Sequence, residues 1–433
     1  MAIATPNNGT TATAPGTSQG YGAPLATVTT LFFMWGFLTC LNDILVPHLK
    51  SIFDLNYTKV MLIQFAFFGA YFIFSIPSAK IVDAIGYQRS MVAGLLTMGA
   101  GAFLFVPAAS VPSYPLFLGA LIVLAAGITC LQVAANPYVA ILGKPETASS
   151  RLNLTQAFNS LGTFLAPFFG GLFILTVARK IEEVRAMAPD ALQAYRLHEA
   201  ATVKMPYVGL GIALVLLAIA IGSFRLPKIE HAQHQLGEKV TDSIWKHPSL
   251  VFGAIGIFVY VGAEVSIGSF LVNYFSQPEI GGLTEKVAAS FVAFYWGGAM
   301  VGRFIGSALL QKVKTGSLLG ICAVCAAALV AVSMLTNGHV AMYSIILVGF
   351  FNSIMFPSIF TLGIAELGPL TGDGSGIMIM AIVGGAIIPV LQGWIADNIG
   401  IHHAFFLPVI CYLYILYFAL SGSKPNSERY AKA

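Results

Sequence analysis

Residues 226–248, LPKIEHAQHQLGEKVTDSIWKHP, form the clearest polar linker in the chain. Apolar stretches of about 20 residues, long enough to cross a bilayer core of about 30 Å, recur on both sides of it. Their approximate limits are 24–50, 58–82, 88–109, 114–142, 152–178 and 203–225 before the linker, and 248–276, 286–311, 315–336, 340–367, 374–397 and 402–421 after it. The linker therefore divides twelve candidate transmembrane segments six and six.

The composition excludes a soluble protein. Of the 433 residues, 57% are hydrophobic and only 9% are charged, whereas a soluble protein carries roughly 25% charged residues and could not cover its surface with fewer. The net charge of +4 is small and does not indicate nucleic-acid binding. We predict an all-α polytopic membrane protein that is in contact with lipid.

The chain is expected to have five parts. These are a disordered N-terminal tail (1–22), a first six-helix bundle (23–225), a cytoplasmic linker (226–247), a second six-helix bundle (248–421) and a cytoplasmic tail (422–433). The tail lacks the basic start and short apolar core of a cleavable signal, so the first segment is expected to act as an uncleaved signal anchor.

The distribution of basic residues predicts the topology. With the N-terminus inside, eight Lys and Arg residues fall outside, and five of them lie in the loop 179–204, where acidic residues are interleaved. The remaining basic residues fall on or near the cytoplasmic face, as the positive-inside rule requires. We expect a multi-pass protein of the plasma (inner) membrane with both termini cytoplasmic.

The two halves resemble each other in sequence. NPYVAILG (136–143) and FPSIFTLG (356–363) place Leu and Gly at the same offsets from a proline, and LAPFFGG (165–171) and IIPVLQG (387–393) form a second pair. Matching prolines in segments four and ten, and in five and eleven, indicate a duplicated six-helix unit.

A charged turn follows segment two. It reads DAIGYQR, with Asp83 and Arg89, and GRFIG, with Arg303, lies at the corresponding end of segment eight. An acidic–Gly–basic turn at this place resembles the gating motif of the major facilitator superfamily, in which charges at helix ends latch the halves. The alternative is an ordinary charged turn; the six-plus-six division favours the gate.

Two acidic residues interrupt apolar segments. Asp43 lies in GFLTCLNDILVPHL of segment one, and Glu264 lies in VYVGAEVSIGSF of segment seven. An ionised acid inside a bilayer costs several kcal/mol unless it faces protein, water or a partner, so such residues are functional candidates. The alternative is a structural acid satisfied by a neighbouring hydrogen bond.

Neutral polar side chains accompany these acids, several at the helical spacing of three or four residues that places them on one face. They are Asn42, Gln132, Asn136, Asn153, Gln156, Asn159, Ser269, Asn273 and Asn352. Amides both donate and accept hydrogen bonds, which suits the hydroxyls of an uncharged sugar. Aromatic candidates for stacking on a sugar ring are Trp35, Phe68, Phe158, Tyr295, Trp296 and Phe356, although most transmembrane aromatics serve packing.

Catalytic and metal chemistry find no support. The sequence has no HExxH, GxSxG or Walker motif. The five cysteines lie within apolar runs, which argues against disulfides. We expect neither an enzyme nor a cofactor.

These residues together resemble the fucose–glucose–galactose porter family of the major facilitator superfamily. The resemblance covers residues 25 to about 420, and its main marks are LNDILVPHL, LQVAANPYVAILG, RLNLTQAFNS and FVYVGAEVSIGSFLVNY. It implies the major facilitator fold, with twelve transmembrane helices in two halves, and alternating-access transport of a hexose coupled to an ion.

The resemblance also assigns roles and shows two departures. The acid of segment one in the fucose–proton branch carries over to Asp43, and the amides of segment five carry over to Gln156 and Asn159. Where that branch has an acid in segment four, this chain has Gln132, and Glu264 stands where that branch has an amide. The pattern resembles the glucose/galactose branch more than the fucose branch.

We therefore expect the amides to bind the sugar and Asp43 and Glu264 to bind the coupling cation, which is a proton or sodium. Desolvation favours a protonated carboxylate, whereas a bound sodium ion keeps it ionised. The alternatives are a hexose uniporter, an L-fucose–proton symporter and, from a different class, a membrane sugar sensor that moves nothing. A monomer is sufficient for this architecture.

Overall fold

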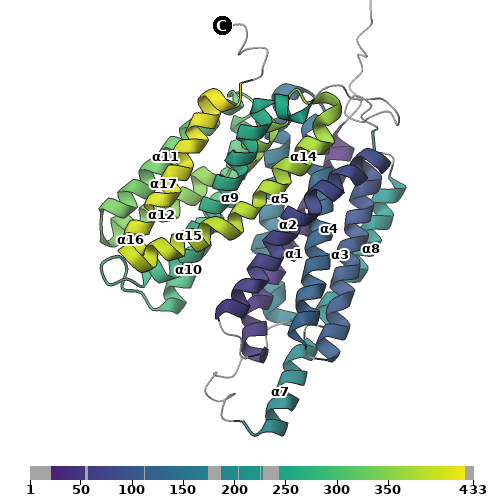
Figure 1. Ribbon diagram of the computed structural model, residues 1–433, viewed down its shortest axis with the longest axis vertical. Helices are drawn as coiled ribbons and strands as arrows, with labels where there is room; N and C mark the ends of the chain where they lie inside the picture. Colours follow the sequence, from purple (N-terminus) through teal and green to yellow (C-terminus); the bar gives the residue numbers. More distant parts are fainter. Residues whose placement is uncertain are drawn as a thin grey trace, which may run out of the picture.

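The computed structural model describes residues 21–424, apart from 54–56, 112, 174–186, 203, 225 and 228–242. Within the helices it leaves out the side chains of 38–39, 41–53, 57–62, 64, 167–173, 196, 199, 200 and 202. All the regular structure in the described ranges is helical, as the composition predicts (Figure 1).

The helices before the linker form the first half of the molecule. They are α1 (Gly22–Phe53), α2 (Tyr57–Ile85), α3 (Tyr87–Ser110), α4 (Tyr114–Ile141), α5 (Ala148–Phe173), α7 (Pro189–Thr202) and α8 (Lys204–Ser223). The helix α7 lies in the stretch 179–204, which we expected to be a loop, so that expectation was incomplete.

The helices after the linker form the second half. They are α9 (Pro248–Phe275), α10 (Glu285–Leu309), α11 (Thr315–Leu335), α12 (Gly338–Asn352), α13 (Met355–Gly363), α14 (Thr371–Met380), α15 (Gly384–Ile399), α16 (Ile401–Ala404) and α17 (Phe406–Tyr417), which ends in a π turn at Phe418–Gly422.

Ten of the twelve expected segments are long apolar helical spans in the described part of the chain. The remaining two are α1, of 32 residues, and α5, of 26 residues. Segments ten and eleven are interrupted rather than continuous, at α12/α13 and α14/α15. Pro357 lies in the first turn of α13, where a residue without an N–H costs the helix little.

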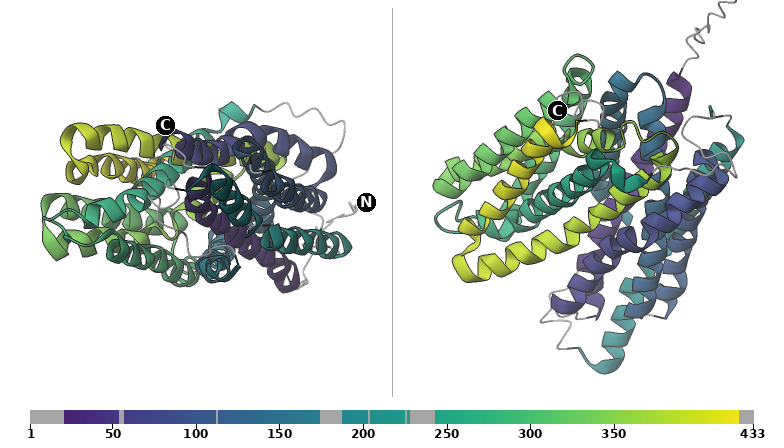
Figure 2. Two further views of the ribbon diagram at one scale, coloured as in Figure 1. Left: turned by 90° about the horizontal axis from the view of Figure 1, so that it is seen from below. Right: turned by 45° about the horizontal axis from the view of Figure 1, so that its top comes forward.

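The two halves meet at one end of the molecule and diverge towards the other (Figure 1). In this view the helices meet at the top, near the C-terminus, and the second half slants away from the first below (Figures 1 and 2). We call the two ends the closed end and the open end. Across the boundary, α2 packs against α14, and α5 packs against α10 and α13.

Within each half, several helices pack with their backbones in close contact, and two of these contacts occupy matching positions in the two halves. In the first half, a Cβ atom added to Gly162 of α5 would lie 2.2 Å from the carbonyl oxygen of Phe33 on α1. In the second half, a Cβ added to Gly384 of α15 would lie 2.0 Å from the carbonyl oxygen of Phe258 on α9. Each glycine stands five residues before a proline, Pro167 or Pro389, so the duplication extends to this contact.

We predict that Gly384→Ala destabilises the protein by about 1–3 kcal/mol, because its methyl group would collide with backbone that cannot turn aside. The matched control is Gly297→Ala on α10, where an added Cβ meets nothing within 4 Å. That change should leave stability equal or slightly higher, since alanine favours a helix. Thermal unfolding of the purified variants in detergent checks both, and equal melting temperatures would contradict the packing.

Candidate functional site

Glu264 lies within the apolar helix α9 and is paired with an arginine. Its Oε1 is 3.7 Å from Nη2 of Arg303 on α10, and the two side chains are 13% and 15% exposed. The hydroxyl of Tyr260, one helical turn earlier, donates a hydrogen bond to the same Oε1 at 2.8 Å. Removing one partner of such a buried pair typically costs about 3–5 kcal/mol, whereas replacing both is often neutral.

A further hydrogen-bonded pair connects this carboxylate to α12. The hydroxyl of Tyr260 is also 3.0 Å from the carbonyl oxygen of Asn352, so its single proton is shared between two acceptors. The amide of Asn352 donates to the hydroxyl of Tyr295 at 2.8 Å. Three helices of the second half, α9, α10 and α12, thus meet around Glu264.

Arg303 also contacts the first half of the molecule. Its Nη1 donates to the hydroxyl of Ser160 on α5, and that hydroxyl donates to the backbone carbonyl oxygen of Gln156 at 3.0 Å. The amide of Asn153 donates to the backbone carbonyl of Arg303 at 2.7 Å. A continuous set of polar contacts therefore runs from Glu264 to α5 across the boundary.

The predicted amides of α4 and α12 are deeply buried. Gln132 is 2% exposed and Asn136 and Asn352 are 0% exposed. Gln132 donates to the hydroxyl of Tyr71 on α2 at 2.7 Å, while both polar atoms of Asn136 lack a hydrogen-bond partner among the described residues. In this conformation solvent does not reach these three residues, so a ligand would need the helices to shift.

The other predicted ligands occupy different surroundings. Gln156 is 6% exposed, whereas the amide of Asn159 donates to the backbone of Phe32 at 2.8 Å and so fastens α5 to α1. Ser269 and Asn273 are exposed on α9. Asn42 and Asp43 fall on α1, but their side chains lie outside the described residues.

The aromatic candidates are also dispersed. Tyr295 is fully buried and Trp35 is 8% exposed, whereas Trp296 is 41% exposed. Phe158 of the first half meets Phe304 of the second edge to face, with ring centroids 5.9 Å apart. Phe356 stacks on Phe360 of its own helix. Phe68, on α2 of the first half, lies against α15 of the second half, because its ring would be 2.7 Å from a Cβ added to Gly385.

The three predicted gating residues do not form one cluster. The carboxylate of Asp83 lies against the first turn of α14, because its Oδ1 would be 2.4 Å from a Cβ added to Gly372. A negative charge at the N-terminal end of a helix interacts favourably with the helix dipole. Arg303 is beside Glu264. Arg89 is exposed at the start of α3.

Polar contacts fasten the halves together at the closed end. The hydroxyls of Ser149 and Thr361 are 2.6 Å apart, and Ser150 donates to the carbonyl of Ser307 at 2.7 Å. Ser375 on α14 donates to the carbonyl of Val133 on α4 at 3.0 Å. Each bond joins one half to the other, so this end must lose them if it opens.

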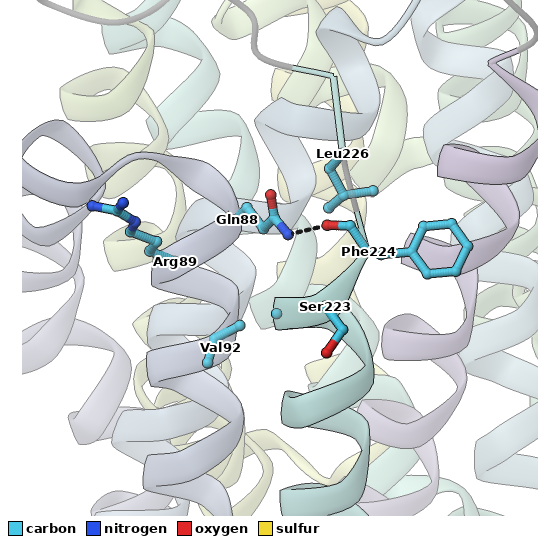
Figure 3. Close-up of a pocket in the computed structure, with 7 residues that line it drawn as sticks. Gln88, Arg89, Val92, Ser223, Phe224 and Leu226 are labelled. Carbon is cyan, nitrogen blue, oxygen red and sulfur yellow. Dashed lines mark hydrogen bonds between the residues drawn. The ribbon is translucent and has the colours of Figure 1, made fainter.

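A cavity of about 740 Å³ lies elsewhere, between the start of α3 and the end of α8 (Figure 3). It is lined by Gln88, Arg89, Val92, Gly222, Ser223, Phe224 and Leu226. Gln88 donates to the carbonyls of Ile221 and Phe224 and so caps α8. Neither Glu264 nor any predicted amide lines this cavity, so it is not part of the site.

Sequence reasoning missed three residues that contact the predicted site residues. Tyr260 stands four residues before Glu264, so helical spacing could have identified it. Tyr71 and Ser160 gave no comparable signal, because their partners lie on other helices. In the described part of the chain no three His, Cys, Asp or Glu side chains come together as a metal site.

The family model of the major facilitator superfamily matches residues 27–382. The chain belongs to the major facilitator superfamily. A crystal structure of the superfamily transporter FucP, in the outward conformation, superposes with a TM-score of 0.87 at 33% identity, covering 93% of this chain and 99% of that one. This family consists of membrane transporters rather than enzymes, and the chain is a multi-pass membrane protein with this fold.

Curated relatives narrow the branch. A glucose/galactose transporter of Brucella abortus is 54% identical over 98% of this chain and 100% of its own length. A putative glucose/galactose transporter of Helicobacter pylori is 45% identical over 93% and 98%. The L-fucose-proton symporter of Escherichia coli is 35% identical over 93% and 94%. The chain therefore belongs to the fucose–glucose–galactose porter branch, as its motifs predicted.

We predict that Tyr71→Phe lowers stability by about 1 kcal/mol, because it leaves the amide of Gln132 without its acceptor in the bilayer. Adding Gln132→Leu to Tyr71→Phe removes the orphaned amide and should recover part of that loss. Thermal unfolding of the single and double variants measures the coupling. Strictly additive effects would show that the two side chains do not interact.

Proposed function

We propose that the protein imports a neutral hexose, glucose or galactose, by alternating access and coupled to a cation. One comparison carries the proposal: the glucose/galactose transporter of Brucella abortus is 54% identical over its whole length, against 35% for the L-fucose-proton symporter of Escherichia coli. Gln132, in place of the acid that the resemblance expects in the fucose branch, is consistent with this choice of substrate.

The sugar site lies along the boundary between the halves. Its ligands are Asn42, Asp43, Gln132, Asn136, Gln156, Asn159, Glu264, Ser269, Asn273 and Asn352, of which Gln132, Asn136 and Asn352 become reachable only as the helices shift. The coupling cation, a proton or sodium, binds at Asp43 and Glu264. The ion pair of Glu264 with Arg303 supports this role, since a charge held in the bilayer interior marks an ion pathway.

The protein works as a monomer in the plasma membrane, with both termini and the linker in the cytoplasm. The closed end is then the cytoplasmic end, and the open end faces outwards. Asp83, Arg89 and Arg303 act as gating residues. The domains are the two six-helix bundles, 23–225 and 248–421, which rock against each other about the site.

Uptake into proteoliposomes tests the function. Labelled glucose is offered under an imposed proton gradient and then under a sodium gradient, with unlabelled glucose, galactose or L-fucose as competitors. Accumulation above the external concentration under one gradient, suppressed by glucose and galactose and much less by L-fucose, is the expected result. Equilibration without accumulation would indicate a uniporter. The structure permits this outcome, because Arg303 already neutralises the charge of Glu264. Binding without flux would indicate a sensor.

We predict that Asp43→Asn and Glu264→Gln each reduce concentrative uptake by at least about tenfold, because each change replaces a carboxylate that binds the coupling ion by a neutral amide that cannot. Size-exclusion profiles establish that the variants are folded. Asp397→Asn, a change at an exposed acid near the end of α15, is the control and should transport normally. Undiminished accumulation by both Asp43→Asn and Glu264→Gln would exclude the coupling role.

A further inference from the structure

The guanidinium of Arg303 contacts both halves of the molecule. The guanidinium reaches Glu264 on α9 with Nη2 and Ser160 on α5 with Nη1. The two contacts belong to different halves, because α5 precedes the linker and α9 follows it. Lys312, a basic residue three positions beyond the end of α10, is exposed instead.

The contacts on the two sides fix the guanidinium. On one side, Oε1 of Glu264 also accepts a hydrogen bond from Tyr260. On the other, the hydroxyl of Ser160 donates a hydrogen bond to the backbone carbonyl of Gln156, so that its oxygen is available to accept from Arg303. The amide of Asn153 holds the backbone of Arg303 from α5. Arginine suits this position because its planar fork offers donors in two directions, whereas the ammonium of lysine is a single point of charge.

We propose that Arg303 is a positioning residue that couples the occupancy of Glu264 to the contact between the halves. While Glu264 is ionised and unoccupied, Arg303 is anchored to it and stabilises the bond to Ser160, and with it the closed end. A cation taken up by Glu264 weakens that anchor, and the bond to Ser160 is released as the halves part. The inference rests on the proposed function and adds to it the residue that transmits the effect.

The energetic requirement of the proposal is modest. Coupling between two sites in a protein typically amounts to a factor of about 5–150 in affinity, which the loss of one partner of a buried ion pair can supply. Reciprocity also follows: anything that breaks the Arg303–Ser160 contact must change the affinity of Glu264 for its cation. This consequence distinguishes a coupling residue from an ordinary contact at the boundary.

Two transport assays on the same proteoliposomes test the proposal. Gradient-driven accumulation of glucose reports coupling, and exchange of internal for external glucose without a gradient reports only the movement of loaded carrier. We expect Arg303→Gln to lower accumulation by at least about tenfold. Arg303→Lys, which keeps the charge beside Glu264 but cannot span both partners, should retain exchange and lose most accumulation. Lys312→Gln is the matched control and should behave as the unmodified protein in both assays.

A double variant separates a specific pair from general damage. Arg303→Gln leaves the carboxylate of Glu264 without its counter-charge, so Glu264→Gln added to it should raise exchange several-fold above that of Arg303→Gln alone. Failure of the second change to restore exchange would overturn the proposal, as would Arg303→Lys accumulating sugar as the unmodified protein does. If the unmodified protein itself did not accumulate sugar, the proposed coupled function would fall instead, and the two failures are therefore distinguishable.

Discussion

An ionised carboxylate can remain inside a bilayer only if the protein supplies its partner, and in this chain that partner also connects the halves. Glu264 is held by Arg303 and Tyr260, and Arg303 in turn reaches Ser160 and Asn153 on α5. Arg303 lies on α10, which packs against both α9 and α5, so the counter-charge of Glu264 and a contact to the first half come from the same side chain.

The halves themselves are built to move as units. Close backbone contacts at Gly162 and Gly384 lock α1 to α5 and α9 to α15, and packing of this kind resists gradual deformation. Glycine packing also occurs between the halves, as at Gly376 against Ala79, but there it is accompanied by single hydrogen bonds such as Ser149–Thr361 and Ser375–Val133. Such bonds are each worth about 1 kcal/mol and can be broken in turn, which suits a boundary that opens and closes.

The sequence was sufficient for the architecture and for part of the site. Apolar length predicted the segments, and the cost of an intramembrane acid singled out Glu264. The break at α12/α13 was not predicted, because a proline such as Pro357 can occupy the first turn of a new helix or the interior of an old one, and hydropathy does not distinguish the two cases. The break at α14/α15 was not predicted either, because the proline of this segment, Pro389, lies inside α15 and does not mark the break. Residues predicted to lie on one face of a helix also have different neighbours: Gln156 lies near the boundary, whereas Asn159 donates a hydrogen bond to Phe32. The spacing of residues along a helix predicts a shared face, but it does not predict which neighbouring helix each side chain contacts.

The most direct test of the account is a pair of distances measured in the same protein. Spin labels at Leu116 and Val287, exposed residues near the starts of α4 and α10, report on the open end. Labels at Ile85 and Leu309, exposed residues at the ends of α2 and α10, report on the closed end. Pulsed electron paramagnetic resonance is recorded with and without glucose. Molecules in which the distance at the closed end lengthens should be those in which the distance at the open end shortens. Two distances that stay fixed, or that change in the same direction, would contradict the alternation of two rigid halves about Glu264 and Arg303.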